Sequence, residues 1–266
     1  MSTTTATTTV TPAAELTALL LAPVPSAALR EALESGRIEQ LVPELPALRM
    51  EQDPIHRHKD VLAHTLAVVD KTSPNLVLRL AALFHDIGKP RTRSYEHGGV
   101  TFRHHEAVGA RITRKRLRAL GYPEDVVEDV AELVRLSGRF KGYADGWTDS
   151  AVRRYARDAG HLLGLLNELV RCDCTTRNRA KEAELHRDLD DLEQRIKALA
   201  EEDRRNAERP GLDGKEVMAH LGIPPGPDVG RALAFLLDIK RREGDLPREE
   251  LLSRLDAWWA AARSQT

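Results

Sequence analysis

The sequence predicts an all-α protein, and three observations support this prediction. Ala, Leu, Glu and Arg dominate the 266-residue chain, a mixture that favours helices over strands. Aromatic residues make up only 4% of the chain. Apolar residues recur at helical spacing, and Gly and Pro separate the periodic segments. With 41% hydrophobic residues, the chain can bury a full core, as one large domain or as two small ones.

Helices are expected along most of the chain. In its first half they span about 13–22, 26–35, 59–71, 74–86, 104–120 and 123–136. Ser73 is the expected N-cap of the fourth of these helices, with Pro74 at its first position. Gly88 is expected to end this helix in the left-handed conformation, and Pro90 to prevent its resumption.

The remaining elements follow from turn residues and from further periodic segments. Residues 91–103 are expected to form a loop or a small hairpin with His97-Gly98-Gly99 as its turn. Phe140, Tyr143 and Trp147 lie in a glycine-rich loop, and we assign them to local packing in preference to stacking on a base. The later helices span about 149–158 (capped by Thr148), 160–173, 179–208, 214–221, 228–241 and 247–262.

The helix expected at 179–208 carries a short heptad seam, formed by Leu185, Leu189, Leu192, Ile196 and Leu199. The seam is too short for a free coiled coil, so it packs either against the body of the protein or against a second subunit. Pro210-Gly211 ends the helix. We therefore divide the chain into a disordered tail (1–12), a first domain (13–178) and a long helix with a helical appendage (179–266).

Charge and cysteine content exclude several classes of protein. The net charge is −1 although 30% of residues are charged, so no global basic field attracts nucleic acid. Interleaved charges, and the basic stretch at 111–118, are best explained as solvated helix faces. The two cysteines, Cys172 and Cys174, are too few for a disulfide framework, and they suggest buried small side chains in a reducing cytoplasm. No secretory leader or membrane-spanning stretch is expected.

Four residues suggest a metal site, namely His64, the pair His85-Asp86, and Asp173. Each lies at or beside the apolar stripe of a predicted helix instead of on its charged face. Imidazole and carboxylate together suit one divalent ion such as Mg, Mn, Ni, Co, Fe or Zn, which would make hydroxide available near neutral pH. Each residue alone also has a structural explanation, such as a core histidine or a helix-end ion pair.

Further residues near this set are candidates for contacts with phosphate. Lys89 and Arg91 follow the His-Asp pair and are placed to hold a phosphate group, and His104 can donate to it. His105 is expected either to stabilise charge on the phosphoryl oxygens or to bind a second ion. Asp60, four residues before His64, is expected to orient the His64 ring.

The spacing of His64, His85-Asp86 and Asp173 resembles the H…HD…D signature of the HD superfamily of metal-dependent phosphohydrolases. Over about residues 36–262 the chain is also similar to the body of bacterial, actinobacterial-type CCA-adding tRNA nucleotidyltransferases. The stretches that carry this similarity are 53–60, 102–109, 147–155 and 221–227. The resemblance implies an HD-domain helical bundle at 13–178 with a C-terminal helical extension, and it implies a metal bound by the four residues.

Two departures from these relatives limit the comparison. Their catalytic head carries a Gly-Ser loop and an Asp-x-Asp pair, whereas here Asp188-Leu-Asp190 falls within a predicted helix without that loop. We therefore do not expect nucleotidyl transfer. Where relatives have another histidine after the helix at 123–136, this chain has Ser137, a poor ligand, and this difference favours a mononuclear site.

The sequence thus leads to two functional hypotheses. The first is a metal-dependent phosphohydrolase that acts on a phosphomonoester or a 2′,3′-cyclic phosphodiester of a nucleotide or similar compound, with Asp86, Lys89 and His105 in catalytic roles. The second is a non-catalytic helical module that binds RNA or a protein. A membrane partner is not expected, and the oligomeric state stays open.

Overall fold

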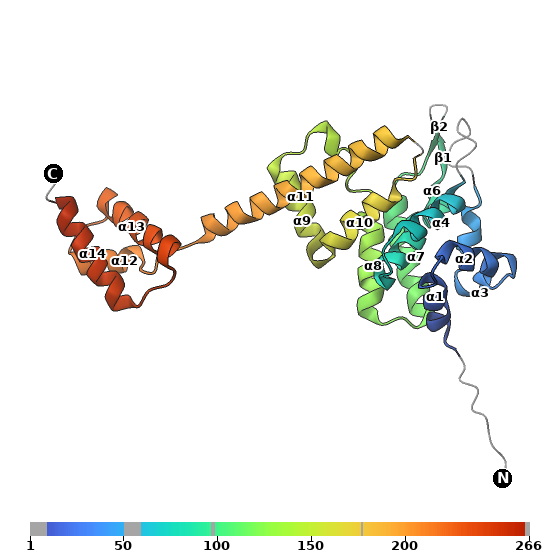
Figure 1. Cartoon of the computed structure of the whole chain (residues 1–266), viewed down its shortest axis with the longest axis horizontal. Helices are drawn as coiled ribbons and strands as arrows, with labels where there is room; N and C mark the ends of the chain where they lie inside the picture. The colour runs from blue at the N-terminus through green and yellow to red at the C-terminus, as the bar shows by residue number, and fades with distance from the viewer. Residues whose placement is uncertain (1–9, 51–59, 97–98, 177, 264–266) are drawn as a thin grey trace, which may run out of the picture. The chain divides into compact units, whose positions relative to one another are not determined.

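The structure, a computed structural model, describes residues 10–50, 60–96, 99–176 and 178–263 (Figure 1). Most of the expected tail, the resembling stretch at 53–59 and the turn residues His97 and Gly98 lie outside the described residues. The helices are α1 (Pro12–Leu20), α2 (Pro25–Glu34), α3 (Ile38–Leu41), α4 (Val61–Lys71), α5 (Leu76–Phe84), α6 (Lys89–Thr92), α7 (His105–Leu120), α8 (Glu124–Leu136), α9 (Asp149–Ala159), α10 (Leu163–Asp173), α11 (Arg179–Ala207), α12 (Gly214–Leu221), α13 (Pro227–Glu243) and α14 (Arg248–Arg263). The predicted all-α class is confirmed.

The described strands form a single small hairpin. Strands β1 (Ser94–Glu96) and β2 (Gly99–Thr101) pair antiparallel, with Tyr95 opposite Val100. The structure thus contains the hairpin form of the element expected at 91–103. Short 3-10 helices at Leu45–Leu48, Tyr143–Asp145 and Gly160–Leu162 were not foreseen from the sequence.

The chain forms two compact units, one up to Lys197 (unit 1) and one from Ala198 (unit 2). The boundary along the chain falls within α11, so most of this long helix belongs to unit 1. Leu189 and Leu192 of the heptad seam are fully buried within the chain, whereas the other three seam residues are partly exposed. The division expected between residues 178 and 179 stays a prediction about independently folding domains.

Helix α5 lies at the centre of unit 1. Every residue from Leu78 to Phe84 is buried, and the helix packs against α1, α4, α8 and α10. Each fully buried leucine or phenylalanine contributes about 1.5–3 kcal/mol through the apolar surface it removes from water. A helix held on all sides in this way fixes the position of the residues that follow it, which are His85 and Asp86.

Both ends of α5 differ from expectation. Its N-cap is Asn75, whose side chain accepts a hydrogen bond from the Leu78 amide, and not Ser73. The Ser73 amide donates to Glu168 on α10. At the other end Gly88 has right-handed helical angles (φ −80°, ψ −18°), and Pro90 lies inside α6. The expectation of a left-handed Gly88 was therefore wrong.

Unit 2 packs α12, α13 and α14 around its own apolar core. That core contains Leu212, Val217, Ala232, Leu236, Ile239, Leu251 and Leu255. Asp213 and Glu216 form a capping box at the start of α12. The Trp258 ring stacks on Phe235 with 5.1 Å between ring centroids, so it anchors the last helix.

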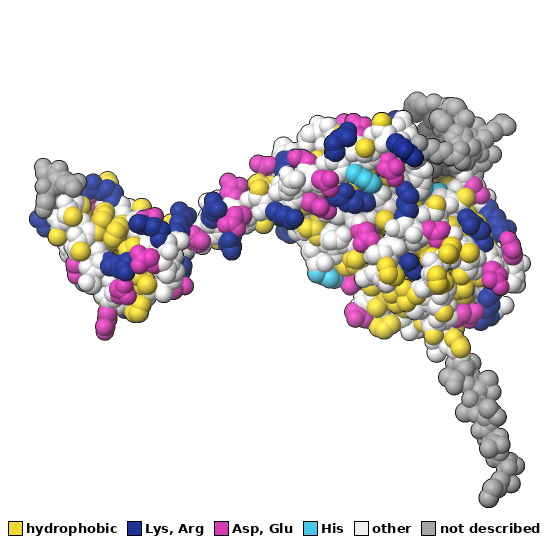
Figure 2. Space-filling model, in the orientation of Figure 1, with side chains coloured by type: hydrophobic (Ala, Val, Ile, Leu, Met, Phe, Trp, Pro, Cys, Tyr) yellow, Lys and Arg dark blue, Asp and Glu magenta, His cyan; other side chains and the backbone are white. Residues whose placement is uncertain are grey.

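Charged side chains of both signs are interleaved on the face of the molecule seen in Figure 2. The basic stretch of α7 is largely paired. Arg114 and Arg118 both lie 2.8 Å from Glu128, and Arg116 lies 2.8 Å from Glu44. This pairing agrees with the explanation of a structural, solvated helix face. No described helix is both long enough and apolar enough to cross a membrane.

Candidate metal centre

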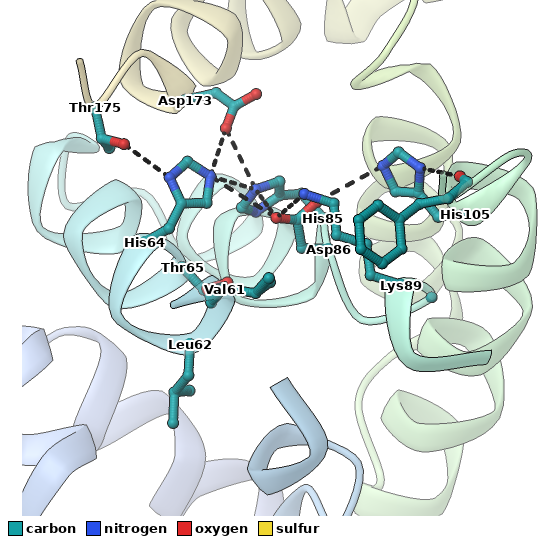
Figure 3. A network of polar contacts seen from close by, with 12 residues as sticks. Val61, Leu62, His64, Thr65, His85, Asp86, Lys89, His105, Asp173 and Thr175 are labelled. Carbon is teal, nitrogen blue, oxygen red and sulfur yellow. Dashed lines mark hydrogen bonds and ion pairs between the residues drawn. The ribbon is translucent and has the colours of Figure 1, made fainter. Parts of the chain in front are cut away.

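Three helices of unit 1 bring the four predicted ligands together (Figure 3). His64 lies in the middle of α4, His85 and Asp86 directly follow α5, and Asp173 is the last residue of α10. Helix α4 begins where it does because the Asp60 side chain accepts a hydrogen bond from the Leu62 amide at 2.7 Å. The buried face of α4 carries Val61, Thr65 and Val68, and His64 lies at the edge of this face.

The ligand atoms converge on one small volume. The Nε2 atom of His64 lies 2.9 Å from Oδ1 of Asp173 and 3.3 Å from Nε2 of His85. The Nε2 atom of His85 lies 3.4 Å from the same Asp173 oxygen and 3.3 Å from Oδ2 of Asp86. That Asp86 oxygen is 3.8 Å from Nε2 of His64. His64, His85 and Asp173 therefore direct a potential metal-ligand atom toward one point, and the Asp86 carboxylate lies beside both imidazoles.

These separations fit a divalent ion. Metal–ligand bonds of about 2.1 Å place neighbouring ligand atoms about 3.0 Å apart in octahedral and about 3.4 Å apart in tetrahedral geometry. The observed distances of 2.9 to 3.8 Å bracket both values. His64, His85 and Asp173 offer ligand atoms that all lie within 4.8 Å of one another, so this group could hold a metal.

The rings of both histidines are oriented by contacts at their other nitrogen. Nδ1 of His85 donates to the carbonyl of Ala82 at 2.7 Å. Nδ1 of His64 lies 2.8 Å from the hydroxyl of Thr175. Such contacts hold a ring in the orientation that presents Nε2 to a metal.

Electrostatic coupling within the group is strong. Burial disfavours the charged form of His85, but the carboxylates of Asp86 and Asp173 outweigh it and raise the pKa of His85 to about 10. Burial alone would raise the pKa of both aspartates. Interactions with His85 and Lys89 nevertheless hold the pKa of Asp86 below its ordinary value, and His64 and His85 do the same for the pKa of Asp173. A divalent cation would replace the proton of His85 as the charge that compensates these carboxylates.

The group opens onto a cavity of ≈ 850 Å³, which we call the metal cavity. Its lining includes His64, His85, Asp86, Asp173, Lys89 and His105. Lys89 is buried and donates to Oδ2 of Asp86 at 2.7 Å. Figure 3 shows His105 on the opposite side of Asp86 from His64, with its Nε2 3.6 Å from Oδ1 of Asp86. Burial lowers the pKa of His105 below its ordinary value despite the nearby Glu106 and Asp86 carboxylates.

Two predicted phosphate contacts lie elsewhere. His104 is exposed and lines a neighbouring cavity of ≈ 360 Å³. Arg91 is exposed on α6 and is not among the described residues that line either cavity. The expectation for Asp60 was wrong, because its carboxylate caps α4 and the His64 ring nitrogens pair with Thr175 and Asp173.

Ser137 and Cys172 have hydrogen-bonded and buried side chains, respectively, whereas Cys174, which was also expected to be buried, is partly exposed. The Ser137 hydroxyl lines the metal cavity but donates to the Val134 carbonyl at 2.9 Å. Cys172 is buried, and burial raises the pKa of its thiol to about 11. The described metal group contains no cysteine ligand. The rings of Phe140 and Tyr143 stack, and the Trp147 ring meets Tyr143 edge-on, which supports their assignment to packing.

Sequence reasoning missed Thr175 and Lys141, both of which line the metal cavity. Thr175 lies two residues after Asp173, and this proximity to a candidate ligand was the available signal. Lys141 lies in the loop after α8, where nothing in the local pattern indicates that its side chain reaches the metal cavity.

Comparison with known proteins gives consistent matches. A family model described as HD domain matches residues 61–257. The chain is 36% identical over 259 residues to a CC-adding tRNA nucleotidyltransferase of Thermus thermophilus, covering 94% of this chain and 56% of the relative. It is 33% identical over 234 residues to an A-adding tRNA nucleotidyltransferase of Deinococcus radiodurans, covering 85% of this chain and 53% of the relative. The chain thus spans about half the length of these curated relatives.

Proposed function

The chain belongs to the HD-domain family, and from this premise we propose that it is a divalent-metal-dependent phosphohydrolase acting on a nucleotide or similar phosphate ester. One observation carries the proposal. The Nε2 atoms of His64 and His85 and the carboxylates of Asp86 and Asp173 converge beside a cavity of ≈ 850 Å³ that is large enough for a nucleotide.

We assign His64, His85, Asp86 and Asp173 as the ligands of one divalent ion. Such an ion would supply positive charge to phosphoryl oxygens and lower the pKa of water. Mixed imidazole and carboxylate ligation suits Mg, Mn, Fe, Co, Ni or Zn, and the residues do not select among these ions. The hydroxyl of Ser137 is engaged by a backbone carbonyl, which supports a mononuclear site.

Lys89 is proposed to bind the phosphoryl group. Its ammonium group lies on the cavity wall, 2.7 Å from Oδ2 of Asp86 and 5.6 Å from the centroid of the Phe102 ring. Little water reaches this buried cation, so its attraction for phosphoryl oxygens is screened less than that of a surface lysine. Lys89 would therefore stabilise the negative charge that accumulates during hydrolysis.

His105 is proposed to move the proton that hydrolysis requires. In this reaction a water oxygen bonds to phosphorus, the ester P–O bond breaks, and one water proton ends on the leaving alkoxide. Nδ1 of His105 donates to the Phe102 carbonyl at 2.8 Å, so the neutral ring carries its lone pair on Nε2. The lowered pKa keeps the ring neutral near pH 7, ready to accept a proton and return it.

The named relatives support a nucleotide or RNA as the class of partner, because both are tRNA nucleotidyltransferases. Phosphomonoesters and 2′,3′-cyclic phosphodiesters are both compatible with the proposed site. The alternative of a helical module that binds RNA without catalysis does not require a converged ligand group, and we treat it as an outcome of the test.

The test combines metal analysis with phosphate release. The purified full chain would be assayed with nucleoside mono-, di- and triphosphates and 2′,3′-cyclic nucleotides, each with Mg, Mn, Co and Ni. We expect bound or bindable metal and metal-dependent turnover that is lost in Asp173→Asn. Asp190→Asn is the matched control, because Asp190 is an exposed residue of α11 that pairs with Arg171 outside the metal cavity.

Absence of both metal binding and turnover with every ion would contradict the proposal. Binding of a tRNA or an RNA hairpin under those conditions, with equal affinity in Asp173→Asn, would instead identify the non-catalytic module.

A further inference from the structure

A second cavity adjoins the metal cavity. It has a volume of ≈ 360 Å³, and its lining includes Lys89, Arg103, His104, His105, Glu106 and Lys141. Three of these residues, Lys89, His105 and Lys141, also line the metal cavity. The two cavities therefore adjoin at these three side chains. We call the second one the basic cavity.

Cations outnumber carboxylates in this lining. Lys89, Arg103 and Lys141 line this cavity together with one carboxylate, that of Glu106, and Lys89 also pairs with Asp86 of the metal cavity. The Glu106 carboxylate lies against Gly138, which has no side chain and leaves room for it. A Cβ atom at Gly138 would lie 2.1 Å from Oε1 of Glu106. The ammonium group of Lys141 is 3.6 Å from this oxygen and its side chain is 73% exposed, so the pair is loose and solvated.

The left-handed backbone conformation of His104 points the consecutive side chains of His104 and His105 in different directions. His104 has φ 61° and ψ 21°, and among the described residues it is the one non-glycine residue with positive φ. This left-handed conformation costs about 1–2 kcal/mol in a residue with a Cβ atom. The His104 side chain makes no capping hydrogen bond at α7, and it lines the basic cavity, whereas His105 lines both cavities.

We infer that the basic cavity binds a second phosphate group of the same substrate, so that the preferred substrate is a nucleoside bisphosphate and not a monophosphate. This inference rests on the proposed function of the metal cavity. The reacting phosphoryl group lies at the metal ligands and Lys89, and the second phosphate contacts Arg103, His104 and Lys141. Guanidinium and ammonium groups donate charge-assisted hydrogen bonds to phosphate oxygens, which are about twice as strong as neutral ones.

Two matched probes test the inference, namely adenosine 3′,5′-bisphosphate and adenosine 5′-monophosphate. With the metal-loaded full chain, we expect kcat/KM and binding affinity to favour the bisphosphate by roughly tenfold or more. Arg103→Gln and Lys141→Gln should each reduce this ratio severalfold, mainly through a weaker Kd for the bisphosphate. Arg111→Gln removes one exposed cation of α7 that lines neither cavity among the described residues, and it should leave the ratio unchanged.

Failure of this inference is distinguishable from failure of the proposed function. Equal kcat/KM and equal Kd for the two probes, with no effect of either cavity variant, would overturn the second phosphate subsite while leaving the hydrolase intact. Preferential binding of the bisphosphate without any hydrolysis, weakened in Arg103→Gln, would support the subsite although the proposed activity had failed.

Discussion

The hydroxyl of Thr175 lies 2.8 Å from Nδ1 of His64, although the two residues are 111 positions apart in the chain. The segment that follows α10 therefore has two roles. Through Asp173 it supplies a ligand atom, and through Thr175 it orients the ring of another candidate ligand. Lys71 fixes this segment to α4 by donating to the Cys174 carbonyl at 2.6 Å. His85 and His105, in contrast, are oriented by backbone carbonyls of their own local segments.

Removal of the Thr175 hydroxyl should weaken metal binding. In Thr175→Val the side chain keeps its shape but loses the contact with Nδ1 of His64, and we expect a Kd for Mn²⁺ or Ni²⁺ roughly 10- to 100-fold higher. Titration calorimetry of the metal-free protein measures this value. Thr175→Ser should restore most of the affinity.

The control for this variant is Thr176→Val. Thr176 also lines the metal cavity, but its hydroxyl accepts a hydrogen bond from the Asn178 amide at 3.2 Å and contacts no candidate ligand. Its metal affinity should match that of the parent chain. Equal affinities for Thr175→Val and Thr176→Val would show that the hydroxyl of Thr175 does not orient His64.

The helices and the four candidate ligands were accessible from the sequence for a physical reason. Apolar periodicity identifies the buried face of each helix, and His64, His85 and Asp173 lie beside that face. Burying a polar side chain there is costly unless it is hydrogen-bonded, paired or bound to a metal. Contacts between distant segments leave no such periodic signal. The contact between the Thr175 hydroxyl and Nδ1 of His64 was therefore missed.

Gly88 illustrates the same limit more sharply. A glycine near a helix end is commonly left-handed, so this conformation was the natural prediction. The actual requirement is a close approach of α7, because a Cβ atom at Gly88 would lie 2.1 Å from the His105 carbonyl oxygen and 2.7 Å from the Gly109 nitrogen. Only the packed structure reveals which of the two reasons makes glycine necessary.

A methyl group at Gly88 should therefore separate α7 from the His85-Asp86 segment. Both clashing groups belong to the backbone and cannot rotate away, so Gly88→Ala should lower the free energy of unfolding by roughly 1–3 kcal/mol. Gly164→Ala is the control, since Gly164 is exposed in α10 and a Cβ atom there meets nothing within 4 Å. Urea unfolding measures both, and a Gly88→Ala variant as stable as Gly164→Ala would contradict the steric argument.

A substitution in the core of unit 2 should lower the stability of that unit without changing metal binding in unit 1. Leu236 of α13 is fully buried in the core of this unit, and Leu236→Ala should cost about 2–5 kcal/mol through lost burial and the cavity it leaves. Metal affinity should be unchanged, because all four candidate ligands belong to unit 1. Thermal unfolding together with metal titration tests this separation, and a large rise in the metal Kd would show that the units are coupled.

Lys89 should affect metal binding and turnover in opposite directions. Its ammonium group lies 2.7 Å from Oδ2 of Asp86, the same oxygen that faces Nε2 of His64 and His85. In Lys89→Met an apolar side chain of similar length replaces this cation, so a metal ion no longer competes with it for the carboxylate. We expect the metal-free variant to be less stable by about 1–3 kcal/mol, because the buried Asp86 carboxylate loses one of its two cationic partners and keeps the other, His85. Metal should bind at least as tightly as in the parent chain and should restore much of this stability.

Turnover of Lys89→Met should nevertheless fall by roughly 10²- to 10³-fold if Lys89 stabilises the reacting phosphoryl group. Weaker metal binding in Lys89→Met would show that the lysine supports the metal site, and unchanged turnover would remove Lys89 from the proposed phosphate contacts.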